Sequence, residues 1–220
     1  LVPPNVSRFA HLAGVAVQSK AAGYVSERYL KGASSRMRTV GWNRIIGCNM
    51  AYRRAVLEAV NGFDPTFWPG EEMLAAFLAG QQTILMFNPE AWVYHYPRVS
   101  FTRFWRQMHG YGATRIRLFR AGVEFELSSV VPALWVASLL ALLLAAPVHS
   151  LVRWLLLLHV AIYLLADLWI TTDKVIETRR LRDAGIFLLV PVMHFSYGLA
   201  EWTEFFRPNK DFGEKPVGAQ

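Results

Sequence analysis

The sequence predicts a chain in two parts, an α/β or α+β layer followed by about three transmembrane helices. Two observations predict this organisation. Apolar residues make up 54% of the 220 residues and charged residues only 18%, and the apolar excess is concentrated in the second half. In the first half, short helical patterns alternate with runs that are rich in β-branched and aromatic residues, which is typical of a layered domain.

The composition excludes several classes of protein. Such an apolar chain is not intrinsically disordered. The single cysteine, Cys48, cannot form an internal disulfide, so a disulfide-stabilised secreted scaffold is excluded. Lys plus Arg number 23 and Asp plus Glu 16, which gives a net charge of 23 − 16 = +7. A basic balance in such an apolar chain favours a membrane surface, and not nucleic acid, as the partner.

Each element of the first half has a local signal. Apolar spacing predicts helices over residues 7–20 and 71–78. A short helix over residues 55–60 ends at Asn61-Gly62, a turn signal. Runs of β-forming residues at 83–87 and 91–96 predict two strands.

Three apolar stretches in the second half predict membrane spans. Residues 127–152 contain no charged side chain, residues 154–172 contain only Asp167, and residues 184–200 contain none. About 20 apolar residues cross the hydrocarbon core as a helix, and in lipid the backbone must satisfy its own hydrogen bonds. The alternative is a large buried helical core.

Basic residues predict the orientation. They precede the first stretch and separate the second from the third, at Arg103, Arg106, Arg115, Arg117, Arg120, Lys174, Arg179, Arg180 and Arg182. The positive-inside rule therefore places residues 1–122 and 173–183 in the cytoplasm. Three spans would leave Arg207, Lys210 and Lys215 outside. This conflict makes the third stretch the weakest of the three, and a short or re-entrant segment is the alternative.

Residues 101–122 predict an amphipathic helix. Phe101, Phe104 and Trp105 share one face, whereas Arg103 and Arg106 lie on another. A cationic helix with bulky aromatic residues lies in the membrane interface and attracts anionic lipid. A helix that packs on its own domain is the alternative.

Four local patterns follow one another in the first half. They are Gly47-Cys-Asn-Met-Ala-Tyr-Arg-Arg54, Asn61-Gly-Phe-Asp64, Pro69-Gly-Glu-Glu72 and Asn88-Pro-Glu-Ala-Trp-Val-Tyr-His95, and Arg106-Gln-Met-His-Gly-Tyr-Gly112 follows them. In order and spacing, the chain resembles the C-terminal half of a membrane-bound family 2 glycosyltransferase of the GT-A fold. The resemblance covers nearly the whole chain from about Val6.

The resemblance implies a fold, a reaction and a location. Residues 1–100 correspond to the acceptor-side half of an α/β GT-A catalytic domain, residues 101–122 to an interfacial helix and residues 123–220 to the transmembrane region. The complete enzyme would transfer a sugar, with inversion, from a nucleotide-sugar to a lipid-linked or polysaccharide acceptor. It would be a multi-pass protein of the inner membrane with its catalytic part in the cytoplasm.

The resemblance also implies that a donor-binding half lies outside this sequence. The Asp-x-Asp metal motif of the family does not occur in these residues. The complete enzyme is expected to use Mg²⁺ or Mn²⁺, with its main ligands outside this chain. We therefore expect the sequence to be a fragment with little activity alone.

The proposed chemistry needs a base for the acceptor hydroxyl and positive charge for the departing diphosphate. Glu71 and Glu72 lie at a predicted helix start, where the helix dipole stabilises carboxylates. The family usually has Glu-Asp here, so Glu-Glu moves the carboxylate by one methylene. Both are candidate catalytic residues, with Glu72 preferred, although acids are common in any first helical turn.

The resemblance assigns further site residues, each with a structural alternative. His95 would approach the donor diphosphate or its metal, or it is an ordinary histidine at a strand end. The candidate substrate-binding residues, which would otherwise belong to solvated surfaces, are Asn49, Tyr52, Arg53, Arg106 and Gln107. Asp64 is expected to form a turn.

Two other functions remain open on sequence grounds. The Glu-Glu pair and the missing donor half favour a non-catalytic membrane subunit or a degenerate homologue. A small transporter component would need polar residues that converge within the spans, where the chain offers Asp167, His159 and His194.

Overall fold

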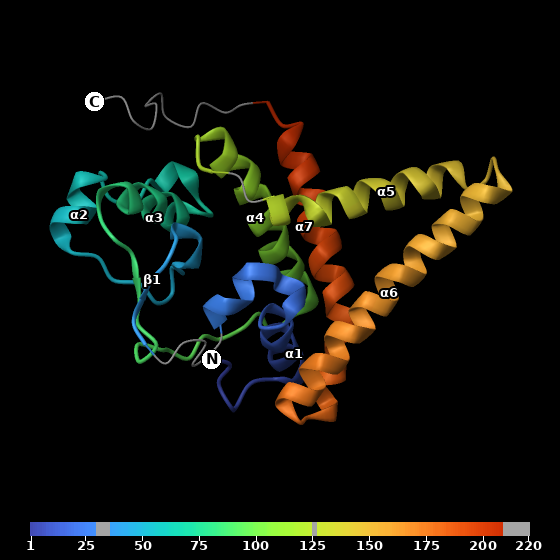
Figure 1. Ribbon diagram of the computed structural model, residues 1–220, viewed down its shortest axis with the longest axis horizontal. Coiled ribbons are helices and arrows are strands. Elements are labelled where there is room, and N and C mark those ends of the chain that lie inside the picture. Colours follow the sequence, from blue (N-terminus) through green and yellow to red (C-terminus); the bar gives the residue numbers. More distant parts are fainter. Residues whose placement is uncertain (30–35, 125–126, 209–220) are drawn as a thin grey trace.

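The structure is a computed structural model that describes residues 1–29, 36–124 and 127–208 (Figure 1). The α-helices are α1 (Arg8–Val17), α2 (Arg54–Ala59), α3 (Glu71–Gln82), α4 (Phe101–Arg120), α5 (Val131–Ala145), α6 (Ser150–Thr178) and α7 (Leu189–Phe205). Short 3₁₀ segments are η1 (Lys20–Tyr29), η2 (Trp42–Arg44), η3 (Pro65–Phe67), η4 (Leu127–Val130) and η5 (Leu181–Leu188). The strands are β1 (Arg38–Thr39) and β2 (Met86–Phe87).

The predicted α/β layer is wrong, and with it the predicted half of a GT-A domain. Among the described residues, the only sheet is the antiparallel pair of β1 and β2, each two residues long. Residues 91–96 are extended but form no ladder; their backbone bonds to Leu1 through the His95 N–H at 2.9 Å. A β-forming sequence becomes a strand only where a neighbour supplies the matching backbone groups. Here most of the predicted strand residues have no such neighbour in the described chain.

The predicted helices of the first half are confirmed. The Ser7 hydroxyl accepts a hydrogen bond from the Ala10 N–H at 3.2 Å and begins α1. The chain leaves α2 through Asn61 and Gly62, which have φ of 60° and 73°, as the turn signal predicted. Helix α3 begins at Glu71 and continues to Gln82.

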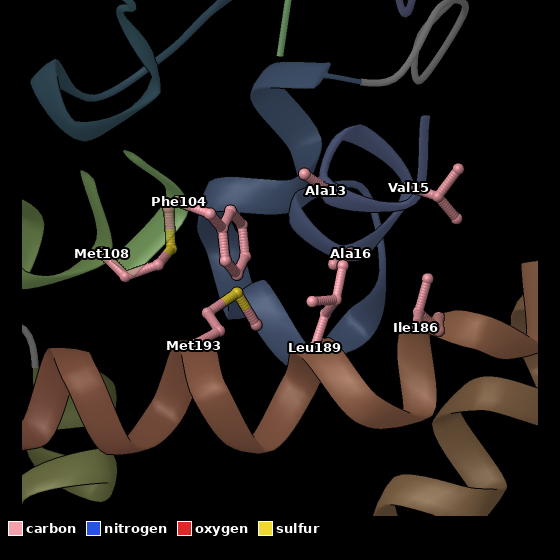
Figure 2. Close-up of a cluster of buried hydrophobic side chains, with 8 residues drawn as sticks. All are labelled: Ala13, Val15, Ala16, Phe104, Met108, Ile186, Leu189 and Met193. Atoms are coloured by element: carbon pink, nitrogen blue, oxygen red, sulfur yellow. The ribbon is translucent and has the colours of Figure 1, made fainter. Parts of the chain in front are cut away.

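Helix α4 lies at the centre of the packing. One hydrophobic cluster joins α4 to α1, η5 and α7 through Ala13, Val15, Ala16, Phe104, Met108, Ile186, Leu189 and Met193 (Figure 2). A second cluster joins α4 to α3 through Phe67, Met73, Leu74, Phe77, Leu118 and Val123. The apolar face of α4 is therefore buried within the protein, between the α2–α3 region and α7 (Figure 1).

Two glycines allow helices to approach each other closely. A Cβ atom at Gly112 of α4 would overlap the backbone carbonyl of Tyr197 in α7. A Cβ atom at Gly198 of α7 would overlap the carbonyl of Pro132, at the start of α5. Because the obstructing atoms are backbone, they cannot move aside by a change of rotamer.

Three segments are long and apolar enough to cross a membrane: Leu127–Ala145, Ser150–Thr178 and Leu181–Phe205. This confirms the three apolar helices predicted from the sequence. Helices α5 and α6 leave the rest of the molecule and converge at a tip formed by residues 146–149 (Figure 1). The protein is therefore membrane-associated.

Candidate functional site

Glu72 lies where two of the sequence patterns meet. It occupies the first turn of α3, and its side chain packs on Gly47. A Cβ atom at Gly47 would lie 3.0 Å from the Glu72 Cγ and 3.5 Å from its Cδ. Glycine at this position therefore leaves the space that the glutamate side chain occupies.

The other two patterns join the same region through the segment that follows Gly47. The Asn49 side-chain amide donates a hydrogen bond to the Ala91 carbonyl at 2.9 Å. The Tyr52 ring packs edge-on against Phe63, with ring centroids 6.3 Å apart. All four patterns therefore converge on residues 47–52, although no sheet holds them together.

The structure separates the roles of the two adjacent glutamates. The Glu71 Oε2 atom accepts a hydrogen bond from the Gly70 N–H at 3.0 Å, so this carboxylate is turned back onto the backbone that precedes its own helix. Glu72 instead extends toward Gly47 and Tyr52. The sequence kept both glutamates as candidates and preferred Glu72, and of the two it is Glu72 that packs on Gly47.

Helix α4 fixes the turn that precedes α3. The Thr114 hydroxyl contacts the Pro69 carbonyl at 2.7 Å, and Arg117 Nη1 donates to the Trp68 carbonyl at 3.1 Å. Gly70 has φ of 121°, and a Cβ atom there would overlap the Thr114 methyl group. The start of α3, and with it Glu72, is thereby held against α4.

The charge of Glu72 affects two neighbouring groups. Burial raises the pKa of the Tyr52 hydroxyl, and the negative charge of Glu72 raises it further. The Tyr52 hydroxyl has no hydrogen-bond partner in the described part of the chain, and it stays protonated at neutral pH. Burial also raises the pKa of the Cys48 thiol, with Glu72 as a smaller contributor. The site thus pairs a carboxylate acceptor with a protonated hydroxyl donor.

His95 and Gln107 line a common pocket beside α1. Its other walls include Gly14, Gln18 and Arg98. Burial lowers the pKa of His95, and the nearby Arg98 charge lowers it further. His95 is therefore mainly neutral at pH 7.

The pocket around His95 does not suit a divalent metal. Mg²⁺ and Mn²⁺ prefer carboxylate and other oxygen ligands, and the residues that line this pocket include no Asp or Glu. Within residues 1–29, 36–124 and 127–208, no group of three or more His, Cys, Asp or Glu side chains could hold a metal ion. That His95 serves as a metal ligand in the complete enzyme stays a prediction.

The remaining predicted residues are placed as follows. Arg53 is exposed and immediately precedes α2, and Arg106 is exposed on α4. Gln107 donates a hydrogen bond to the Tyr111 hydroxyl at 2.8 Å. Asp64 accepts from the Thr66 N–H at 2.8 Å, which confirms its predicted role in a turn.

A buried group of charged residues between α4 and α7 was not predicted from the sequence. Arg115 and Arg117 were predicted only to help set the membrane orientation, and their exposure is only 8% for the Arg115 residue and 14% for the Arg117 side chain. Arg117 Nε lies 3.1 Å from Glu204 Oε1. Glu201 is fully buried one turn earlier on α7. Two acids at i, i+3 in an otherwise apolar helix were the available signal.

These features define a membrane-associated helical protein with an acidic side chain at the junction of four converging segments. No family model, curated protein or solved structure matches the chain.

Cys48 offers a direct test of the proximity of Glu72. The thiol reacts as the thiolate, and a nearby negative charge disfavours the thiolate and raises the pKa of Cys48. We expect the Glu72→Gln variant to have a lower Cys48 pKa. At about pH 7.5, below the ordinary pKa of a thiol, the variant should therefore react faster with iodoacetamide. The Glu71→Gln variant is the matched control, and equal rates in both variants would contradict the arrangement.

Proposed function

We propose that the chain is the acceptor-activating part of a membrane-bound glycosyltransferase, with Glu72 as the general base. The proposed reaction transfers a sugar from a nucleotide-sugar to a hydroxyl of a lipid-linked or polysaccharide acceptor, at the cytoplasmic face of the membrane. The observation that carries the proposal is the position of Glu72, against Gly47 and beside Tyr52, in contact with the segment on which the other patterns converge. The resemblance in those patterns supplies the class of reaction.

In the proposed reaction, this part of the protein supplies the general base. The acceptor hydroxyl attacks the anomeric carbon while the bond from that carbon to the diphosphate oxygen breaks. Glu72 takes the hydroxyl proton, and the nucleoside diphosphate leaves with the bonding electrons. Because this is a single displacement, the anomeric configuration inverts.

Neighbouring groups suit a substrate that carries hydroxyls. The protonated Tyr52 hydroxyl is buried without a partner among the described residues, so it can donate a hydrogen bond to the acceptor or the sugar only once its cover opens. Binding of the donor diphosphate, and of the Mg²⁺ or Mn²⁺ that would neutralise it, is assigned to residues outside this chain. None of the steps assigned to the chain depends on that metal.

The connection between the site and the membrane part favours a lipid-linked acceptor. Helix α4 holds the turn before Glu72 through Thr114 and Arg117, and the same helix packs along α7. A base fixed in this way stays near the membrane surface, where the head group of a lipid-linked acceptor lies.

The test compares two adjacent glutamates in the full-length protein in native membranes. A panel of nucleotide-sugars labelled in the sugar serves as donor, and incorporation into membrane lipid and polysaccharide is measured. We expect Glu72→Gln to lower the transfer rate about a hundredfold or more, the usual effect of losing a general base. Glu71→Gln, which alters only the contact with the Gly70 N–H, should keep most of the activity.

Two results would contradict the proposal. If both variants transfer sugar at the wild-type rate, Glu72 is not the base. If wild-type membranes incorporate no more label than membranes that lack the protein, a non-catalytic membrane subunit is favoured instead.

A further inference from the structure

Helix α7 differs from α5 and α6 in what covers it. Of the most apolar stretch in each candidate span, 17% is buried in Leu127–Ala145, 6% in Ser150–Thr178 and 44% in Leu181–Phe205. Along residues 189–204, every side chain except that of Thr203 is buried or half-buried. A helix that crosses the bilayer with only a few neighbouring helices exposes apolar surface to lipid. Helix α7 exposes little of its surface.

Helix α7 is buried mainly by α4, which runs beside it in the same direction. Near the start of α4, the Trp105 carbonyl accepts a hydrogen bond from the Ser196 hydroxyl at 2.8 Å. Near its end, Arg120 Nη2 donates to the Phe205 carbonyl at 2.8 Å. The two helices therefore share one orientation with respect to the membrane.

Helix α4 is unsuited to the hydrocarbon core. It carries five arginines, Arg103, Arg106, Arg115, Arg117 and Arg120, of which Arg103 and Arg106 are exposed. If α7 crossed the bilayer, these exposed guanidinium groups would lie beside its middle. Charged side chains at that depth are costly unless they face the protein interior or water.

The opposite end of α7 is also held by charged groups. Before α7, the buried Asp183 of η5 pairs with His11 of α1 at 2.7 Å. At the end of α6, the buried Lys174 donates to the Gln18 carbonyl at 3.2 Å. These contacts fix the soluble α1 region against the base of α6 and the start of α7.

Helices α5 and α6 have the opposite character. They form a hairpin that extends away from α7 (Figure 1). The Tyr163 hydroxyl of α6 lies 2.9 Å from Nδ1 of His194 in α7. The surface of this hairpin is largely apolar, with exposed Leu143, Leu144, Leu151, Leu155, Leu157, Leu158 and Ile162. Its exposed polar side chains near the tip are those of His149, Ser150 and Arg153. Helix α7 thus runs across the base of the hairpin and not along it.

We propose that the α5–α6 hairpin alone enters the bilayer, that lipid acyl chains cover it, and that α7 lies with α4 at the membrane surface without crossing. Both ends of α7 then lie on the same side as α1 and α3. This arrangement reduces the conflict in the charge distribution, because Arg153 is the single Lys or Arg between residues 121 and 173 whereas Arg179 and Arg207 flank α7. Lys210 and Lys215 lie outside the described residues, and by sequence they follow Arg207.

Cysteine labelling in intact cells tests this topology. Cys48 is first replaced by serine, since it is exposed and would react. Single cysteines are then introduced as Arg179→Cys before α7 and Thr203→Cys near its end, both at exposed positions. We expect a membrane-impermeant maleimide to label neither variant in intact cells and both after permeabilisation. An outward-facing cysteine in an unrelated membrane protein of the same cells confirms that the reagent reaches the outer surface.

The two topologies give different results at one residue. In a three-span topology, Arg179→Cys labels only after permeabilisation whereas Thr203→Cys labels in intact cells, and this result would overturn the proposal. Protection of Thr203→Cys from a water-soluble maleimide even after permeabilisation would also overturn it, because the end of α7 would then lie in the hydrocarbon.

Discussion

The Gly112→Ala variant is expected to lose the packing of α4 on α7. Alanine is ordinarily the better residue in a helix, by about 1 kcal/mol. Here, however, the added methyl group would overlap the backbone carbonyl of Tyr197 and come within 3.1 Å of the Ala200 Cβ. The helices must therefore move apart, and overpacking of this kind costs about 1–3 kcal/mol and occasionally more. Because α4 also holds the turn before Glu72, we expect Gly112→Ala to disturb the position of Glu72 as well.

Gly110 provides the matched control on the same helix. A Cβ atom there would lie 3.5 Å from the Pro69 Cγ, an ordinary contact. Gly110→Ala should therefore be neutral or slightly stabilising. Thermal unfolding of both variants in detergent, followed by circular dichroism, measures the difference. A Tm for Gly112→Ala that equals or exceeds that of Gly110→Ala would contradict the close approach of α4 and α7.

The Glu204→Gln variant is expected to be among the least stable single variants of this chain. The Glu204 side chain is 5% exposed and lies 3.1 Å from Arg117 and 3.4 Å from Arg207. Removal of one partner of a buried ion pair leaves the other charge uncompensated, which costs about 3–5 kcal/mol. The same change frees Arg117, which also holds the Trp68 carbonyl before α3.

An exposed ion pair in the same chain serves as the control. Arg54 and Glu58 lie 3.7 Å apart on α2, with side chains that are 91% and 69% exposed. Such surface pairs contribute about 0.3–0.5 kcal/mol, so Glu58→Gln should leave Tm almost unchanged. If Glu204→Gln and Glu58→Gln lowered Tm equally, the buried network would not stabilise the contact between α4 and α7.

The sequence determined the features that depend on local pattern. The helices that begin at Arg8 and Glu71 follow from apolar spacing together with capping and turn residues, and each forms near its predicted place. The three apolar helices follow from length and composition. These predictions succeed because the period and hydrophobicity of a segment do not depend on its distant neighbours.

The sheet was predicted incorrectly because a strand is not a local structure. Residues 83–87 and 91–96 have the side chains that strands favour, but in the described part of the chain only Met86 and Phe87 form a ladder, with Thr39 and Arg38. The patterns that had been expected to lie on a GT-A framework instead meet through individual contacts, such as that between Asn49 and Ala91. β-Propensity describes how well a side chain fits the pleated surface of a sheet. It does not determine whether a neighbouring strand is present to form that sheet.

The candidate site was predicted as a set of residues but not as an arrangement. The sequence placed Glu71 and Glu72 in one helical turn and preferred Glu72 by resemblance alone, whereas the fold directs Glu71 to the Gly70 N–H and Glu72 to Gly47. From the sequence, Arg117 was only one of the basic residues that predict the orientation, whereas in the structure it is largely buried and pairs with Glu204 of α7. The direction and burial of a side chain depend on elements far away in the chain, so only the tertiary structure could decide them.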